Sequence, residues 1–197
     1  MASTSSCPVS YFLVSGAPGS GKTTLIHRAC ALLRESRPSL RMYGFYTREL
    51  RDARGQRSGF QVVSIANETV SARLASTVPP AGFRGPFLGK YAVTVHEFET
   101  IALDVFRQVE ENTADLLVVD ELGKMESFSQ PFCDAFHHWL NSNTDTALLA
   151  SIPISRGKPL PIVAAAQSSA RSRVIELNRG NRDAKCQQVC DALLQCL

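Results

Sequence analysis

The chain of 197 residues contains no apolar run as long as a membrane-spanning helix. Such a helix needs about 20 consecutive apolar residues, so we expect no membrane partner. The first ten residues, MASTSSCPVS, also lack the apolar centre of a signal peptide. We therefore expect residues 1–10 to form a flexible leader and the protein to be soluble and cytoplasmic.

A large excess of one charge is missing too, because the formal net charge is only +3. The basic residues are spread along the chain and are not interleaved with aromatic ones. Nucleic-acid-binding proteins usually gather Lys and Arg into a patch or stripe. The composition therefore argues against a nucleic-acid partner, and we expect a monomer.

Paired metal-binding cysteines are absent as well, since none of the six cysteines forms a C-x-x-C motif. Cys186 and Cys190 stand one helical turn apart, but no second His or Cys pair has matching metal-ligand spacing. In a reducing compartment such residues are most simply free thiols that pack as small apolar side chains. The six are Cys7, Cys30, Cys133, Cys186, Cys190 and Cys196.

What the sequence does contain is a glycine-rich stretch, GAPGSGKT, that matches G-x-x-x-x-G-K-[ST]. In this pattern backbone N–H groups converge on a phosphate, the lysine reaches the β- and γ-oxygens, and the hydroxyl ligates Mg²⁺. An apolar strand-like run precedes the stretch and a helix-like run follows it, so the positive end of a helix adds to the anion site. The pattern predicts a nucleoside-triphosphate site formed by Gly16, Ala17, Pro18, Gly19, Ser20, Gly21, Lys22, Thr23 and Thr24.

Strand-like and helix-like segments alternate along most of the chain. Because parallel strands need crossover helices, the alternation predicts an α/β fold, a parallel sheet flanked by helices, in one domain over residues 11–197. We expect strands at 11–15, 42–47, 91–95, 116–120, 146–152 and 173–177. We expect helices at 23–36, 96–111, 131–141, 159–170 and 183–197.

The alternation of strands and helices is interrupted over residues 48–92, where short β-rich runs replace the helical pattern. Two of these runs, 60–65 and 69–74, flank the turn-former Asn67. This arrangement predicts an antiparallel β-hairpin inserted into the α/β pattern.

A second candidate constellation, LLVVDELGKME, begins with a buried strand and ends with acids. Asp120, at the carboxyl end of that strand, can hold Mg²⁺ through water or through Thr23. Glu121 is then well placed to orient or deprotonate an attacking water. We expect Asp120 and Thr23 at the metal, and Lys22 and Glu121 in catalysis. A supporting role for Glu121 stays open.

Several other polar residues follow the expected strands, and each has an ordinary alternative. Lys124 is a candidate catalytic cation for the γ-phosphate or a solvated loop lysine. Arg156, with Lys158 beside it, and Arg182 are candidates for nucleotide contacts. Ser151 senses the γ-phosphate or makes a strand-end hydrogen bond. Four arginines line the nucleotide site or are solvated: Arg48, Arg51, Arg54 and Arg57.

These segments resemble a known family. The combination of GAPGSGKTTLI, GFYTRELRDARGQRSGF, VVDELGKMESFS and IPISRGKPL is similar to the THEP-type nucleoside-triphosphatases, over residues 12–182. The resemblance implies a RecA-like or kinase-like P-loop core that hydrolyses triphosphates slowly and with broad base tolerance. RDARGQRSGF is one residue longer than the usual pattern, and Ser151 replaces a frequent Thr.

Three functions remain after these observations. The first is Mg²⁺-dependent hydrolysis of nucleoside triphosphates, favoured by Glu121 beside Asp120 and by the lack of an evident acceptor site. The second is a small-molecule or nucleotide kinase using the same P-loop, although the expected hairpin is β-rich and precedes the metal-binding strand, unlike an Arg-rich lid. The third is an NTP-dependent switch or assembly subunit.

Overall fold

The structure is a computed structural model, and it describes residues 9–142, 145–154 and 157–197. Its described strands form one mixed sheet in the order β5-β6-β4-β3-β2-β7-β8-β1-β9. The five strands from β2 to β9 in this order run parallel to their neighbours, as the alternation predicts. They are β2 (Met42–Arg51), β7 (Leu116–Val119), β8 (Ala147–Pro153), β1 (Tyr11–Gly16) and β9 (Ser172–Leu177).

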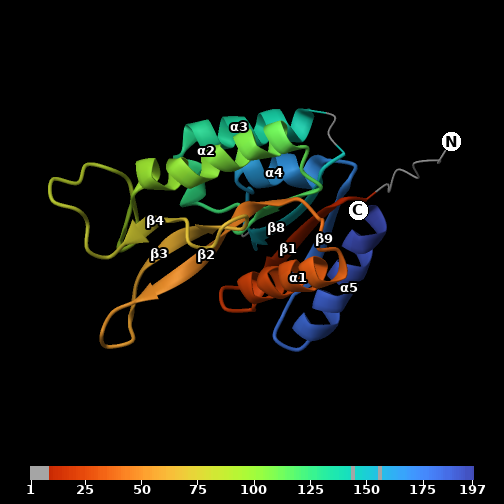
Figure 1. Cartoon of the computed structure of the whole chain (residues 1–197). Helices are drawn as coiled ribbons and strands as arrows, with labels where there is room; N and C mark the ends of the chain where they lie inside the picture. The colour runs from red at the N-terminus through yellow and green to blue at the C-terminus, as the bar shows by residue number, and fades with distance from the viewer. Residues whose placement is uncertain (1–8, 143–144, 155–156) are drawn as a thin grey trace.

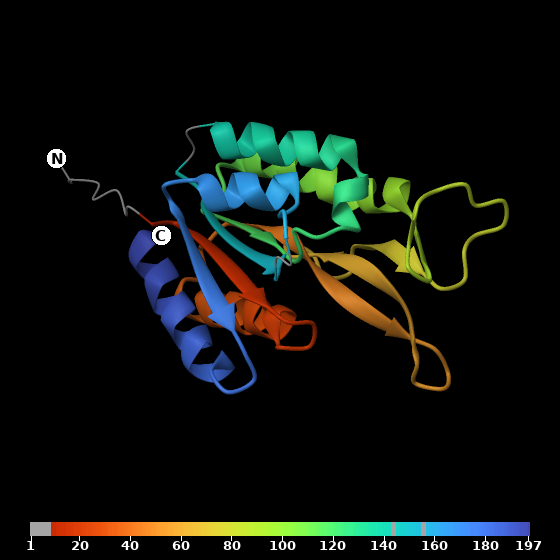
Figure 2. The same cartoon turned by 180° about the vertical axis from the view of Figure 1, so that it is seen from behind.

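Helices cover both faces of the parallel part of the sheet (Figures 1 and 2). One face carries α2 (Val95–Asn112), α3 (Gln130–Asn141) and α4 (Pro161–Ser168), and the other carries α1 (Lys22–Ser36) and α5 (Arg182–Cys196). Two buried apolar clusters result, one on each side of the sheet. Phe136 and Trp139 of α3 lie in the first cluster. The α/β class is therefore confirmed.

The β-rich insertion contains the expected antiparallel hairpin, and its strands continue the same sheet. β2 runs to Arg51, beyond the expected end at residue 47, and pairs antiparallel with β3 (Arg57–Ser64). β4 (Ser71–Ser76), β6 (Tyr91–Val93) and β5 (Phe87–Leu88) then extend the antiparallel part. The physical reason is that β2 has a free edge once β7 pairs with its other side. β3 begins three residues before the predicted strand 60–65, and β4 begins two residues after the start of the predicted strand 69–74.

Gly44 marks the place where β2 lies closest to its parallel neighbour. Its φ is 143°, and a Cβ added there would lie 1.9 Å from the Val118 carbonyl oxygen. A side chain cannot occupy that space, so glycine is required for β2 to approach β7. This contact aligns the carboxyl ends of the two strands, where the candidate site lies.

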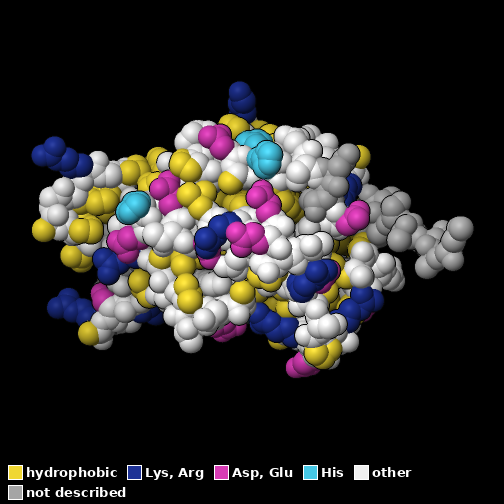
Figure 3. All heavy atoms as spheres, turned by 45° about the horizontal axis from the view of Figure 1, so that its top comes forward, with side chains coloured by type: hydrophobic (Ala, Val, Ile, Leu, Met, Phe, Trp, Pro, Cys, Tyr) yellow, Lys and Arg dark blue, Asp and Glu magenta, His cyan; other side chains and the backbone are white. Residues whose placement is uncertain are grey.

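The outer surface of the α2–α4 face carries mixed charge (Figure 3). Lys and Arg side chains on this face stand among Asp and Glu side chains and do not form one continuous basic area. Within the described residues, no helix is both long enough and apolar enough to cross a membrane.

Candidate active site

The loop that joins β1 to α1 has the form of a phosphate cradle. β1 is buried between β8 and β9 and ends at Gly16, and α1 begins at Lys22. A Cβ on Gly16 would lie 2.7 Å from the Leu177 carbonyl oxygen, so only glycine fits this close approach. Gly19 and Gly21 adopt φ values of 75° and 100°, which turn the backbone toward the helix. No side chain caps α1, so its first N–H groups can bind an anion.

Ser20 adds an unusual feature to this loop. Its backbone N–H donates to the Ala17 carbonyl oxygen at 3.0 Å, which closes the turn. Its hydroxyl oxygen is buried and has no hydrogen-bond partner among the described residues. A buried hydroxyl without a partner is costly, so this position of the loop suits a polar ligand.

Lys22 connects the loop with the acids that follow β7. Its ammonium group donates to the Gly16 carbonyl oxygen at 3.0 Å and lies 3.3 Å from Glu121 Oε2. The Lys22 side chain is only 10% exposed, whereas that of Glu121 is 34% exposed. The P-loop lysine and the candidate base therefore meet at the carboxyl edge of the parallel strands.

Asp120 stands at the carboxyl end of β7 and is 1% exposed. Burial raises the pKa of its carboxyl group, while hydrogen bonds from Ser151, Thr23 and Thr47 and the charge of Lys22 act in the opposite direction. The Thr23 contact brings together the two residues that the sequence predicts at the metal. Burial is the larger effect, so the pKa stays above its ordinary value, while the Thr23 contact directs the Asp120 carboxyl group toward the P-loop.

Ser151 and Thr47 hold Asp120 from the two neighbouring strands. β8 lies between β7 and β1, and the Ser151 hydroxyl of β8 donates to Asp120 Oδ1. On the other side, the Thr47 hydroxyl of β2 donates to the Asp120 carbonyl oxygen at 2.5 Å. The strand-end hydrogen bond expected for Ser151 is present, with Asp120 as its partner. Thr47 was missed, although GFYT places a polar residue just past a buried run.

Mg²⁺ fits the donor set at this edge. Mg²⁺ is usually held by one or two carboxylates together with substrate phosphates and water, not by a cage of protein ligands. The Thr23 hydroxyl and the buried Asp120 carboxylate supply the two oxygen ligand types expected. No cluster of three or more His, Cys, Asp or Glu side chains suited to a metal occurs in the described part of the chain. Thr23 and Asp120 can therefore hold the ion beside a triphosphate.

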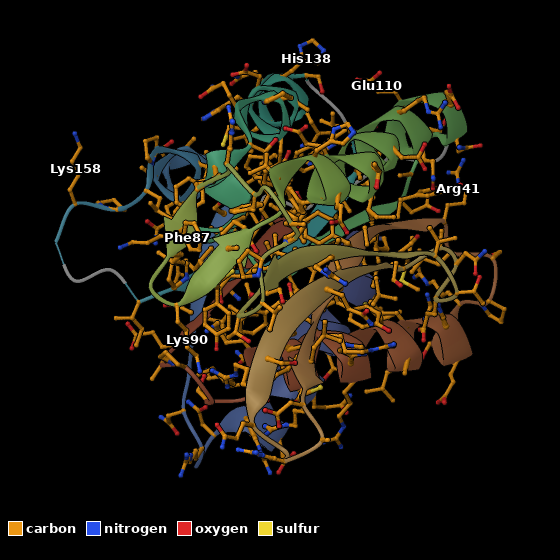
Figure 4. All side chains as sticks on the ribbon, turned by 90° about the vertical axis from the view of Figure 1, so that its left-hand side faces the viewer. Arg41, Phe87, Lys90, Glu110, His138 and Lys158 are labelled. Atoms are coloured by element: carbon orange, nitrogen blue, oxygen red, sulfur yellow. The ribbon has the colours of Figure 1, made fainter. Side chains whose placement is uncertain are left out.

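The remaining candidates are placed differently. Lys124 is exposed on the turn after Glu121. Arg182 begins α5, and its Cδ lies 3.5 Å from the position of a Cβ on Gly21, which puts it beside the loop. Arg156 lies outside the described residues. Lys158 is exposed and points away from the body of the molecule (Figure 4).

Three of the four candidate arginines, Arg51, Arg54 and Arg57, are exposed at the ends of β2 and β3 and on the turn between them. Glu49 of β2 pairs with Arg51 on the same strand and with Arg57 on β3. Arg48 differs, because its guanidinium group donates to the Tyr46 hydroxyl at 2.7 Å. Tyr46 borders a cavity of about 420 Å³ that reaches Thr24 of the P-loop, with His27, Arg34 and Glu68 also on its wall. Arg48 is thus the one of these arginines whose contacts lead toward the nucleotide loop.

The comparison with protein families agrees with this geometry. Residues 11–190 match the family model described as NTPase. The chain belongs to this NTPase family. The human cancer-related nucleoside-triphosphatase is 36% identical over 176 residues, which cover 88% of this chain and 90% of that protein. Nucleoside-triphosphatase THEP1 of Thermotoga petrophila is 35% identical over 179 residues, or 90% and 89% of the two chains.

A solved structure agrees at the level of the fold. The solution structure of a human cancer-related nucleoside triphosphatase superimposes with a TM-score of 0.78 at 34% identity. The match covers 94% of this chain and 97% of that one. The THEP-type resemblance of the sequence is confirmed.

Proposed function

We propose that the chain hydrolyses nucleoside 5′-triphosphates to the diphosphate and phosphate in a Mg²⁺-dependent reaction. The observation that carries the proposal is the meeting of Lys22 and Glu121 at 3.3 Å, next to the buried Asp120. A phosphate cradle alone would serve binding or transfer equally well. An acid beside the P-loop lysine adds a base for water, which hydrolysis requires.

In this proposal each residue has a defined role. Free backbone N–H groups within residues 16–24 hold the β-phosphate, and Lys22 neutralises charge on the β- and γ-oxygens. Thr23 and Asp120 hold Mg²⁺, which would shield the phosphate charge. Glu121 takes a proton from the attacking water as the bond between the γ-phosphorus and the bridging oxygen breaks.

The same contacts bear on rate and specificity. Phosphate oxygens have to replace Glu121 as the partner of Lys22 before Glu121 can act as a base, which fits slow turnover. The residues assigned here address phosphates and the metal, which fits broad tolerance for the base. Lys124, Arg156 and Arg182 remain proposed contacts to the phosphates or the nucleoside.

The proposal is tested by measuring phosphate and diphosphate from ATP, GTP, CTP and UTP, with Mg²⁺ and with EDTA. We expect equal amounts of both products, dependent on Mg²⁺. Lys22→Ala should lower turnover by about 10²-fold or more, the scale for loss of one strong electrostatic donor. Lys90→Ala is the matched control, because Lys90 is exposed on the β5–β6 turn (Figure 4).

Candidate acceptors distinguish hydrolysis from transfer in the same assay. Diphosphate that forms only together with a phosphorylated acceptor would contradict the proposal and establish a kinase. Equal turnover by the Lys22→Ala and Lys90→Ala variants would contradict the assignment of the loop.

A further inference from the structure

Glu126 is a buried carboxyl group that the hydrolysis scheme does not use. It begins η1 (Glu126–Phe128), the short 3₁₀ helix between β7 and α3, and it is 4% exposed. Its own backbone N–H and that of Gly123 donate hydrogen bonds to the carboxyl group. Burying such a group is costly even when it is hydrogen-bonded. The fold therefore keeps an expensive acid close to the proposed base.

Gly123 brings the two acids together. A Cβ placed on Gly123 would lie 2.7 Å from Glu126 Oε2 and 3.0 Å from Glu121 Oε1. Both carboxyl groups therefore lie close to the α-carbon of Gly123. Glu126 is buried and Glu121 is half-buried. The backbone of residue 123 is the structural link between Glu126 and Glu121.

The turn from Glu121 to Met125 is fastened at three points. The Leu122 N–H donates to the Ser151 carbonyl oxygen at 2.9 Å, which ties the turn to β8. The Ser127 hydroxyl donates to the Gly123 carbonyl oxygen at 2.6 Å. The Glu126 carboxyl group accepts from the Gly123 N–H and is the third fastening.

Glu126 can fill this place without adding a full charge beside the site. Burial, together with the neighbouring charges of Glu121 and Asp120, raises the pKa of its carboxyl group to about 8, against the lowering effect of its two backbone hydrogen bonds. The protonated form therefore predominates at neutral pH. A neutral group at this point leaves Lys22 and Glu121 as a simple ion pair.

We propose that Glu126 is a positioning residue for Glu121: it anchors Gly123 and so holds the Glu121 carboxylate toward Lys22 and the phosphate site. The proposal rests on the function proposed above. A displacement of about 1 Å in a reacting group can cost about 10²-fold in rate. Glu126 thus acts on turnover through Glu121 and makes no contact with the nucleotide.

The kinetic test compares the wild type with Glu126→Ala and Glu126→Gln. Glutamine keeps the neutral shape and an acceptor for the Gly123 N–H, whereas alanine removes the anchor. We expect kcat to fall about 10- to 100-fold in the alanine variant, with the Kd for a fluorescent ATP analogue within about threefold of the wild type. The glutamine variant should stay within about threefold in both quantities.

Amide hydrogen exchange over residues 121–128 provides a readout that does not need catalysis. We expect faster exchange in the alanine variant and wild-type exchange in the glutamine variant. A wild-type kcat in an active Glu126→Ala protein, equal losses in kcat and affinity, or unchanged exchange would each overturn the positioning role. Absence of hydrolysis by the wild type would instead contradict the proposed function, and exchange would still decide whether Glu126 holds the turn.

Discussion

Three carboxyl groups follow β7 within a few residues, and their surroundings give them different chemistry. The Asp120 carboxyl group is buried and accepts from the Thr47 backbone N–H of β2 and from hydroxyl groups of β8 and α1. Glu121 is partly exposed and pairs with Lys22. Glu126 is buried against backbone N–H groups. Only Glu121 combines access to water with contact to the P-loop lysine, which is why we assign the base to it.

Glu121→Gln tests this assignment directly. The change keeps the length and the hydrogen-bonding capacity of the side chain but removes the base. We expect kcat to fall about 10²- to 10⁴-fold, while nucleotide affinity stays within a few-fold. The variant should therefore retain intact triphosphate, which is checked by chromatography of the bound nucleotide.

Glu110→Gln is the control for Glu121→Gln, because Glu110 lies exposed on α2 (Figure 4). Equal losses of binding and turnover in Glu121→Gln would make Glu121 structural. Turnover at the wild-type rate would point to a different base.

At the scale of the elements, β2 determines how the site is assembled. One edge of β2 pairs parallel with β7, and the other pairs antiparallel with β3. The close contact at Gly44 sets the distance between β2 and β7, and Thr47 reaches Asp120 three residues later. The junction of the parallel and antiparallel parts is therefore also a support of the metal-binding acid.

Gly44→Ala should destabilise the protein severely. The new methyl group would meet the Val118 carbonyl oxygen, and the φ of 143° is unfavourable for alanine. We expect a loss of about 3 kcal/mol or more in the free energy of unfolding, the upper range for such backbone clashes. The midpoint of urea-induced unfolding measures this loss.

Gly55→Ala is the matched comparison for Gly44→Ala. Gly55 has a φ of 73° in the β2–β3 turn, but an added Cβ would meet nothing within 4 Å. Its cost should be about 1 kcal/mol, from backbone strain alone. Equal midpoints for the two variants would show that the contact between β2 and β7 is not tight.

At the scale of the whole molecule, Glu126 should make stability depend on pH. Its folded pKa is about 8, against an ordinary value of 4.5. The folded state therefore binds this proton more tightly than the unfolded state. The contribution of Glu126 to the unfolding free energy is fully present below about pH 4.5 and is lost as the pH rises toward 8.

Glu126→Gln removes that dependence, since glutamine does not titrate. As the pH rises from 6 to 8, the unfolding free energy of the variant should increase by at least about 1 kcal/mol relative to that of the wild type. Urea unfolding in EDTA at several pH values measures the difference. The unfolding free energy of the Glu110→Gln variant should instead change with pH as that of the wild type does. If the Glu126→Gln variant also followed the wild type, the raised pKa of Glu126 would be contradicted.

Sequence alone determined the elements whose signals are local. The glycine spacing of residues 16–23 needs no distant partner to define a phosphate loop, and the apolar runs of β1, β7 and β8 identify buried strands by composition. Asp120 and Glu121 could be singled out because they directly follow one of those runs. The family resemblance rests on these same local segments.

Tertiary structure decided the contacts that join distant segments. Ser151 reaches Asp120 across 31 positions of the sequence, and Thr47 reaches it across 73. Neither distance is encoded in a local pattern, because each depends on which strands become neighbours in the sheet. The burial of Glu126 likewise depends on the segments that pack around it. The extension of β2 depends on β3, since a polar stretch becomes a strand only when a partner edge is available to it.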